Sequence, residues 1–302
     1  MTMKRRVGFG AFPRALAAAL QWKLLLLWFL FTLIPASIVA RPLHGLLSTL
    51  LDHSVHAGEW ARSFHGLAMT DVLVQVGRQG LPALSAAAVL GMLLTLLLAP
   101  FLVGMSVTAV RGPHRPGFGE LMHGGLSEYW RLFRFMLWAL ALYGIAFMLG
   151  RLAAMWASHQ ADQAILESQA DFAAMVARTV LIVLLVIAQS MVEAGRGRIV
   201  ADPAQRSATR AFFSGIALVF KRPLVTLGLY LAVTVTGFAI TFLLGLWRMH
   251  QVAVGPVGFS LALLVTLLMI VSMAWMRTAR VAAMGAVAKA TLKPGSNTVA
   301  PA

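Results

Sequence analysis

The chain has 302 residues, of which 60% are hydrophobic and only 12% are charged, and its mean hydropathy is +0.82. This composition excludes an ordinary soluble domain and predicts an integral membrane protein. The sequence contains no cysteine, which excludes thiol nucleophiles, disulfides and thiolate metal sites.

Six apolar segments are long enough to cross a bilayer, which takes about 20 residues in a helix. We expect the first segment to remain as a membrane span and not to be removed as a signal peptide, because its apolar run is too long for a signal core. The sequence predicts an all-α, polytopic membrane bundle with six transmembrane helices in three hairpins, forming a single domain over residues 1–302. In chain order the segments lie at about 22–40, 82–110, 135–157, 174–192, 223–246 and 256–276.

Outside the spans, every second segment of the chain is rich in Lys and Arg, and the segments between them are poor in both. One alternate set, which includes both ends of the chain, holds 19 of the 25 Lys and Arg residues and four of the ten acidic residues, so it carries the entire net charge of +15. The charges of the other set cancel. The positive-inside rule therefore predicts that the basic side, with the N-terminus and the C-terminus, is cytoplasmic. A miscounted span would have disturbed this alternation.

Residues 12–29, 121–138 and 206–230 each begin with a short amphipathic stretch and continue into the first span of a predicted hairpin. Each stretch leads into an aromatic residue followed by a basic one. An aromatic ring suits the headgroup level of a bilayer, and the basic side chain beside it can reach the water. We therefore expect three interfacial amphipathic helices on the cytoplasmic side, ending near the pairs Trp22 and Lys23, Trp130 and Arg131, and Phe220 and Lys221.

Residues 41–80 form the first outer loop, which is amphipathic, and residues 277–302 form a cytoplasmic tail whose end we expect to be disordered. On a helix in the outer loop, Asp52, His53, His56 and Glu59 would share one side. The same stretch lacks a complete ligand set at a diagnostic spacing, so we predict neither a metal site nor a cofactor.

The segment from residue 193 to residue 210 is rich in arginine and follows the fourth span. Its sequence lacks the Gly-Lys-Ser/Thr of a phosphate-binding loop and the aromatic residues that stack on bases, so we predict no nucleic-acid partner. Glu193 is expected to pair with Arg196 on the same helix face. We interpret the basic residues as contacts for anionic lipid headgroups or for a membrane or cytoplasmic protein partner: Arg196, Arg198, Arg206, Arg210, Lys221 and Arg222.

Away from their ends, the six predicted spans contain no Asp, Glu, Lys, Arg or His, which disfavours a carboxylate relay for proton-coupled transport. Gly237, Thr241 and Gly245 form a small-residue stripe that allows another helix to approach closely, and we expect that helix to belong to the same chain. Pro35, Pro100 and Gly104 are candidates for helix kinks or for the lining of a solute path.

Two stretches of the sequence resemble a known group of proteins. "FGELMHGGLSEYWRLF" and "VEAGRGRIVADPAQRSATRAFF" leading into "KRPLVTLGLYLA" are similar to segments of uncharacterised six-span inner-membrane proteins of proteobacteria. The resemblance implies a bacterial inner membrane and a fold, but no activity.

Three functions fit these observations. The first is a nonenzymatic accessory or scaffold subunit of a transport or envelope assembly, which we favour. The second is an autonomous carrier or channel for a small or amphipathic solute. The third is a membrane-embedded enzyme acting on lipids, for which His53 and His56 would have to converge with a carboxylate near a lipid-sized groove.

Overall fold

The computed structural model describes residues 10–51, 70, 74, 77, 81–112, 114–251 and 255–291. Six helices in these ranges are long and apolar enough to cross a membrane. This confirms the predicted all-α membrane bundle. The six are α2 (Trp22–Leu51), α5 (Leu81–Arg111), α7 (Tyr129–Asp162), α8 (Glu167–Ala201), α10 (Pro223–Met249) and α11 (Gly255–Lys289).

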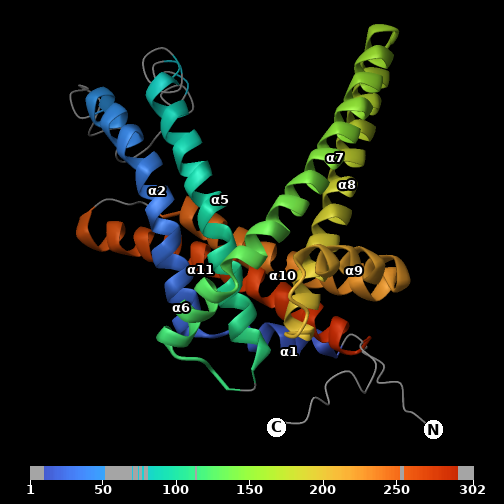
Figure 1. Ribbon diagram of the computed structural model, residues 1–302. Coiled ribbons are helices and arrows are strands. Elements are labelled where there is room, and N and C mark those ends of the chain that lie inside the picture. Colours follow the sequence, from blue (N-terminus) through green and yellow to red (C-terminus); the bar gives the residue numbers. More distant parts are fainter. Residues whose placement is uncertain are drawn as a thin grey trace, which may run out of the picture.

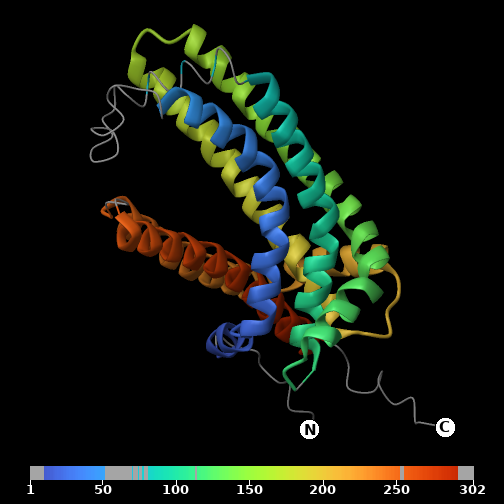
Figure 2. The same cartoon turned by 90° about the vertical axis from the view of Figure 1, so that its left-hand side faces the viewer.

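The long helices pair as three hairpins, α2 with α5, α7 with α8, and α10 with α11. Figures 1 and 2 show that the hairpins diverge from a common region at one end of the molecule. We call this region the base: it is where the first turns of α2, α7 and α10 meet the last turns of α5, α8 and α11. Away from the base, each hairpin runs in its own direction.

A short helix precedes each hairpin, as the sequence predicted: α1 (Ala11–Ala18), α6 (Phe118–Ser127) and α9 (Ala208–Lys221). The Ser207 side chain caps α9 by accepting a hydrogen bond from the Arg210 backbone N–H at 3.3 Å. The aromatic residue at each entry stays exposed, by 63% at Trp22, 70% at Trp130 and 71% at Phe220. These rings are free to lie at the headgroup level of a bilayer.

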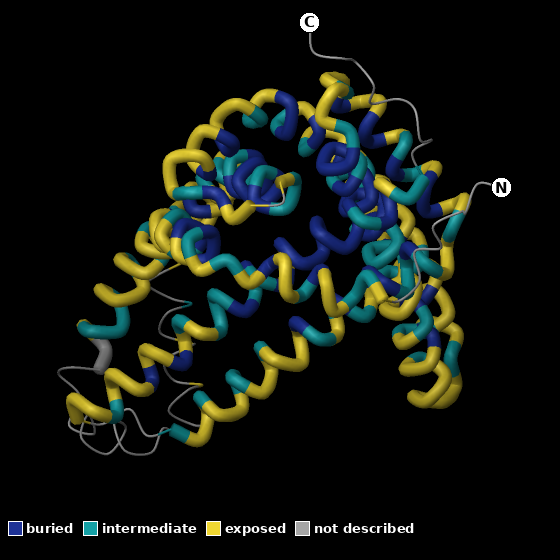
Figure 3. Tube along the Cα trace, turned by 90° about the horizontal axis from the view of Figure 1, so that it is seen from below, coloured by how far each residue is buried: buried dark blue, intermediate teal, exposed yellow. Residues whose placement is uncertain are grey.

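Burial is concentrated in the base (Figure 3). In α8 every residue from Ser190 to Ala201 is at least partly buried, and in α11 the longest run of buried residues extends from Thr278 to Gly285. Farther out, residues are buried mainly by the other helix of the same hairpin, as where Gly150 packs against Leu181. The remaining faces expose large apolar side chains, including Ile182 at 60%. Such surfaces suit a lipid environment, since a soluble monomer rarely exposes them.

Glycines allow the helices of the base to cross in close contact. A Cβ atom on Gly215 of α9 would lie 2.3 Å from the Gly195 nitrogen of α8. A Cβ atom on Gly197 would lie 2.5 Å from the carbonyl carbon of Met284 in α11. Both distances are far inside van der Waals contact, so only glycine fits at these crossings. The Gly-Arg-Gly-Arg sequence at 195–198 is therefore explained by helix packing.

Two helices run farther than the sequence predicted. Helix α8 continues to Ala201, where we expected a loop from residue 193, and α11 continues to Lys289, where we expected a tail from residue 277. In both cases the extension is buried in the base, where packing against other helices replaces the lipid contact that a hydropathy pattern detects. Helix α2 likewise extends to Leu51, into the predicted outer loop.

Candidate functional site

A buried carboxylate lies at the centre of the base. Glu193 of α8 is 1% exposed, and its Oε1 accepts hydrogen bonds from Arg196 Nη1 at 2.9 Å and from Gln189 Nε2 at 3.1 Å. The Tyr143 hydroxyl of α7 donates to Gln189 Oε1. These contacts confirm the predicted pair between Glu193 and Arg196. They also join α7 to α8 through polar groups within an apolar surrounding, where such bonds are strengthened.

Helix α11 contributes two arginines to the same region. Arg280 is 7% exposed, and its Nη1 donates to the Tyr230 hydroxyl of α10 at 3.4 Å. The guanidinium of Arg277 lies 5.6 Å from the ring centre of Trp28 in α2, within the range of a cation–π contact. The Trp28 indole N–H donates in turn to Ser106 Oγ of α5 at 3.0 Å.

All six long helices therefore contribute a polar side chain to one region, which we call the base cluster. It consists of Trp28, Ser106, Tyr143, Gln189, Glu193, Arg196, Tyr230, Arg277 and Arg280. Two contacts cross between hairpins here. Arg277 of α11 lies over the Trp28 ring of α2, and Ser106 Oγ of α5 lies 3.4 Å from Thr278 Oγ1 of α11. The cluster is the polar junction of the three hairpins.

Positive charge exceeds negative charge in the base cluster. Three guanidiniums accompany one carboxylate, and Glu193 forms its ion pair with Arg196. Among the described residues, no carboxylate lies within 4.0 Å of Arg277 or Arg280. Because arginine does not lose its proton in proteins, the cluster carries a net charge of about +2 at neutral pH.

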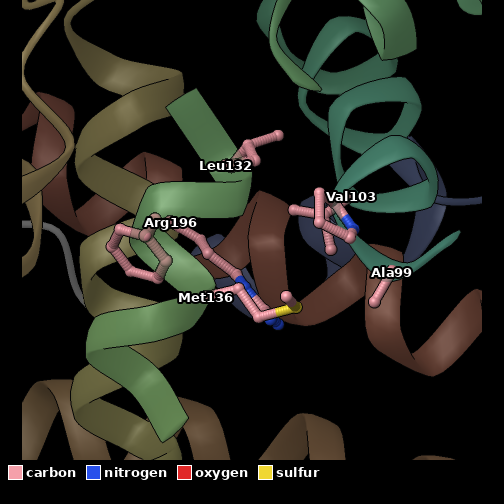
Figure 4. Close-up of a pocket in the computed structure, with 7 residues that line it drawn as sticks. Ala99, Val103, Leu132, Met136 and Arg196 are labelled. Atoms are coloured by element: carbon pink, nitrogen blue, oxygen red, sulfur yellow. The ribbon is translucent and has the colours of Figure 1, made fainter. Parts of the chain in front are cut away.

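A small pocket opens beside Arg196 (Figure 4). Its walls are apolar and come from two hairpins: α5 gives Ala99, Pro100 and Val103, and α7 gives Leu132, Phe135 and Met136. The guanidinium of Arg196 is the charged group of the lining. The pocket therefore combines hydrocarbon walls with the guanidinium of Arg196, whose charge is paired with Glu193.

A second ionic group ties the helices together near the base surface. Glu128, between α6 and α7, pairs with Arg111 of α5 at 2.9 Å and with Arg131 of α7 at 3.1 Å. Arg111 also donates to the Ile199 carbonyl at 3.2 Å, and Arg131 donates to the Gln205 carbonyl. Because both arginines are bound to a carboxylate and to backbone carbonyls, the role of this group is to hold the helices together.

The basic residues singled out in the sequence do not form one surface. Arg196 and Arg198 lie on the buried last part of α8 and are only partly accessible, and Arg222 is also partly buried. Arg206, Arg210 and Lys221 are exposed. Only Arg196 belongs to the base cluster.

The small-residue stripe of α10 faces α11. A Cβ atom on Gly237 would lie 2.4 Å from the side chain of Met276, and Thr241 Oγ1 is 2.7 Å from Ser272 Oγ. A Cβ atom on Gly245 would meet the end of Met269 at 3.5 Å. Within the chain, the stripe thus serves the pairing of the third hairpin.

The kink candidates also lie at helix contacts. The Pro35 carbonyl would lie 3.3 Å from a Cβ atom on Gly91, so it packs α2 against α5. A Cβ atom on Gly104 would lie 3.0 to 3.3 Å from the Gly124 and Gly125 backbone of α6. Pro100 lines the pocket beside Arg196.

Sequence reasoning missed most of the base cluster. It places Arg277 and Arg280 in a tail, and it gives Trp28, Tyr143 and Tyr230 no role beyond their spans. The sequence offered two indications of this cluster: two tyrosines within apolar spans, and two arginines three residues apart after the last span. The outer-loop residues Asp52, His53, His56 and Glu59 lie outside the described residues. In the described ranges, no group of three His, Asp or Glu residues is placed to hold a metal ion.

A scan against protein-family models gave no match, and searches of curated proteins and of solved structures gave none either.

Proposed function

We propose that the protein is a nonenzymatic accessory or scaffold subunit of a transport or envelope assembly. The observation that supports this best is the distribution of burial: the hairpins are joined in the base, and beyond it their outward apolar faces are not covered by one another. A base of this kind holds three hairpins in fixed directions. Helices of partner subunits can then pack between or beside them, as small and apolar surfaces in membranes allow.

The proposed setting is the inner membrane of a bacterium, with the base toward the cytoplasm. The unequal distribution of Lys and Arg along the sequence supports this orientation. The exposed basic side chains of α9, Arg210 and Lys221, would then lie where anionic headgroups or a cytoplasmic partner can reach them.

An autonomous carrier is the second candidate, and the pocket beside Arg196 and Pro100 is the observation that favours it. A carrier would need polar groups from several hairpins along the whole depth of the membrane. In the described part of the chain, the side-chain polar contacts between long helices of different hairpins lie in the base. They join Ser106 to Thr278, Arg111 to the Ile199 carbonyl, and Arg277 to the Trp28 ring. This distribution supports the scaffold better than the carrier.

Photo-crosslinking in intact cells tests the proposal. A benzophenone amino acid is placed at one exposed position in each of three elements: Ile182 on the second hairpin, Val235 on the third hairpin, and Phe213 on α9. A subunit of an assembly gives a discrete protein adduct from at least one position. Lipid adducts alone from all three positions would contradict the scaffold proposal.

A further inference from the structure

Two of the three arginines of the base cluster, Arg277 and Arg280, lack a carboxylate partner within 4.0 Å among the described residues. The buried Nε of Arg280 has no hydrogen-bond partner among those residues either. An uncompensated charge in an apolar surrounding is costly, and a side chain that cannot be deprotonated cannot escape this cost by losing its proton. The structure thus leaves the charge of two guanidiniums to an anion from outside the chain.

Arg277 and Arg196 are within reach of such an anion, whereas Arg280 is buried. The Arg277 side chain is exposed even though it lies over the buried Trp28 ring, and Arg196 lines the pocket between α5 and α7. An anion held by these guanidiniums would also lie near Glu193, whose carboxylate already neutralises Arg196. The remaining charge of about +2 is what attracts the ligand.

The surroundings of the arginines are apolar. The pocket beside Arg196 is walled by six apolar residues of α5 and α7: Ala99, Pro100, Val103, Leu132, Phe135 and Met136 (Figure 4). Beyond the pocket, α5 and α7 diverge from the base (Figure 1). A free inorganic ion would make no apolar contact with these walls, whereas the acyl chains of a lipid would pack against them. Basic pockets between transmembrane helices near the cytoplasmic side are a common form of site for anionic headgroups.

We propose that Arg196, Arg277 and Arg280 bind the phosphate headgroup of one anionic phospholipid, with its acyl chains between the α2–α5 and α7–α8 hairpins. Arg277, whose side chain is exposed, contacts the phosphate oxygens, and the buried Arg280 contributes its charge; neither has a carboxylate partner among the described residues. Arg196 stays paired with Glu193 and lines the route of the chains. The site does not depend on whether the protein is a scaffold or a carrier, since the charge of the cluster and the apolar walls exist in either case.

The net charge gives an order of preference. A headgroup with two phosphate charges matches a site of about +2 better than a headgroup with one, and a zwitterionic headgroup matches it least. Cardiolipin should therefore bind more tightly than phosphatidylglycerol, and phosphatidylethanolamine should bind weakly.

Native mass spectrometry of the purified full-length chain tests this proposal. Delipidated protein is titrated separately with cardiolipin, phosphatidylglycerol, phosphatidylethanolamine and inorganic phosphate. We expect one tightly held anionic lipid per chain in the order given. Arg277→Gln should weaken that binding about tenfold, as the loss of one charge-assisted contact implies. Arg277→Lys should keep part of the binding, since the charge remains.

The matched control is Arg178→Gln, which removes the same charge from an exposed residue in the middle of α8, outside the base, and should leave lipid binding unchanged. Arg277 is exposed and has no ion pair within the described residues, so its replacement should not prevent folding; helical circular dichroism of each variant checks this. Equal loss in Arg277→Gln and Arg178→Gln would overturn the site, as would binding of phosphatidylethanolamine as tight as that of the anionic lipids. Binding of inorganic phosphate without lipid adducts would show the wrong source of the anion and overturn the lipid proposal.

Discussion

The crossing of α8 and α11 at Gly197 gives the sharpest test of the base. In Gly197→Ala the new methyl group would lie 2.5 Å from the Met284 carbonyl carbon and 2.6 Å from its oxygen, whereas ordinary contact begins at 3.4 Å. Because the obstacle is helix backbone, the two helices must separate by nearly 1 Å. Overpacking of this kind costs about 3 kcal/mol at the upper end of its usual range. Alanine returns about 1 kcal/mol through its better helix propensity. We therefore expect a net loss of about 2 kcal/mol.

The measurement is thermal unfolding of the purified protein in a mild detergent, followed by helical circular dichroism. Gly144→Ala is the matched control, because Gly144 lies within α7 and a methyl group added there would meet nothing within 4 Å. Gly144→Ala should unfold at the wild-type temperature or above it, since only the gain in helix propensity applies. Equal midpoints for the two variants would refute the close crossing of α8 and α11.

Other predictions concern the polar groups and the orientation. Glu193→Gln should lower the unfolding midpoint by the equivalent of about 3 kcal/mol, because it leaves Arg196 without its counter-ion, while Glu120→Gln on the exposed surface of α6 should change it little. Tyr143→Phe should cost about 1 kcal/mol in the same assay through the lost bond to Gln189. The double variant Arg206→Gln and Arg210→Gln should keep wild-type stability and topology; a loss of stability at unchanged topology would show that these exposed arginines do more than orient the chain. Single cysteines, introduced into a chain that has none, should label from opposite sides of the membrane at positions 210 and 165; labelling from one side would refute the hairpin topology.

The outline of the fold could be predicted from sequence because it depends on properties that act locally. A span is recognised by the length of its apolar run. The alternation of Lys and Arg predicts on which side of the membrane each connecting segment lies. The exposed Trp22, Trp130 and Phe220 follow from the same preference of aromatic rings for the interface. These features need no knowledge of which helices touch.

The base could not be predicted in the same way, because its residues are defined by contacts between hairpins. The spans predicted from hydropathy end at Val192 and at Met276, whereas α8 and α11 continue as buried helices that carry Arg196 and Arg280. A glycine such as Gly197 looks like a loop residue until the Met284 backbone is placed against it. The pair of Glu193 and Arg196 was predictable, since residues three apart share a helix face. Its neighbours Arg277 and Tyr143 come from distant parts of the chain.

The proposed role as a membrane subunit is tested most directly by gentle extraction of the tagged chain from its native membrane, followed by mass spectrometry of what co-purifies in stoichiometric amount. The account predicts a defined protein partner at a fixed ratio to the chain. It also predicts that this partner is the protein captured by crosslinking from the exposed hairpin positions. Recovery of the chain alone, or with lipid only, would contradict the scaffold role and favour an autonomous carrier.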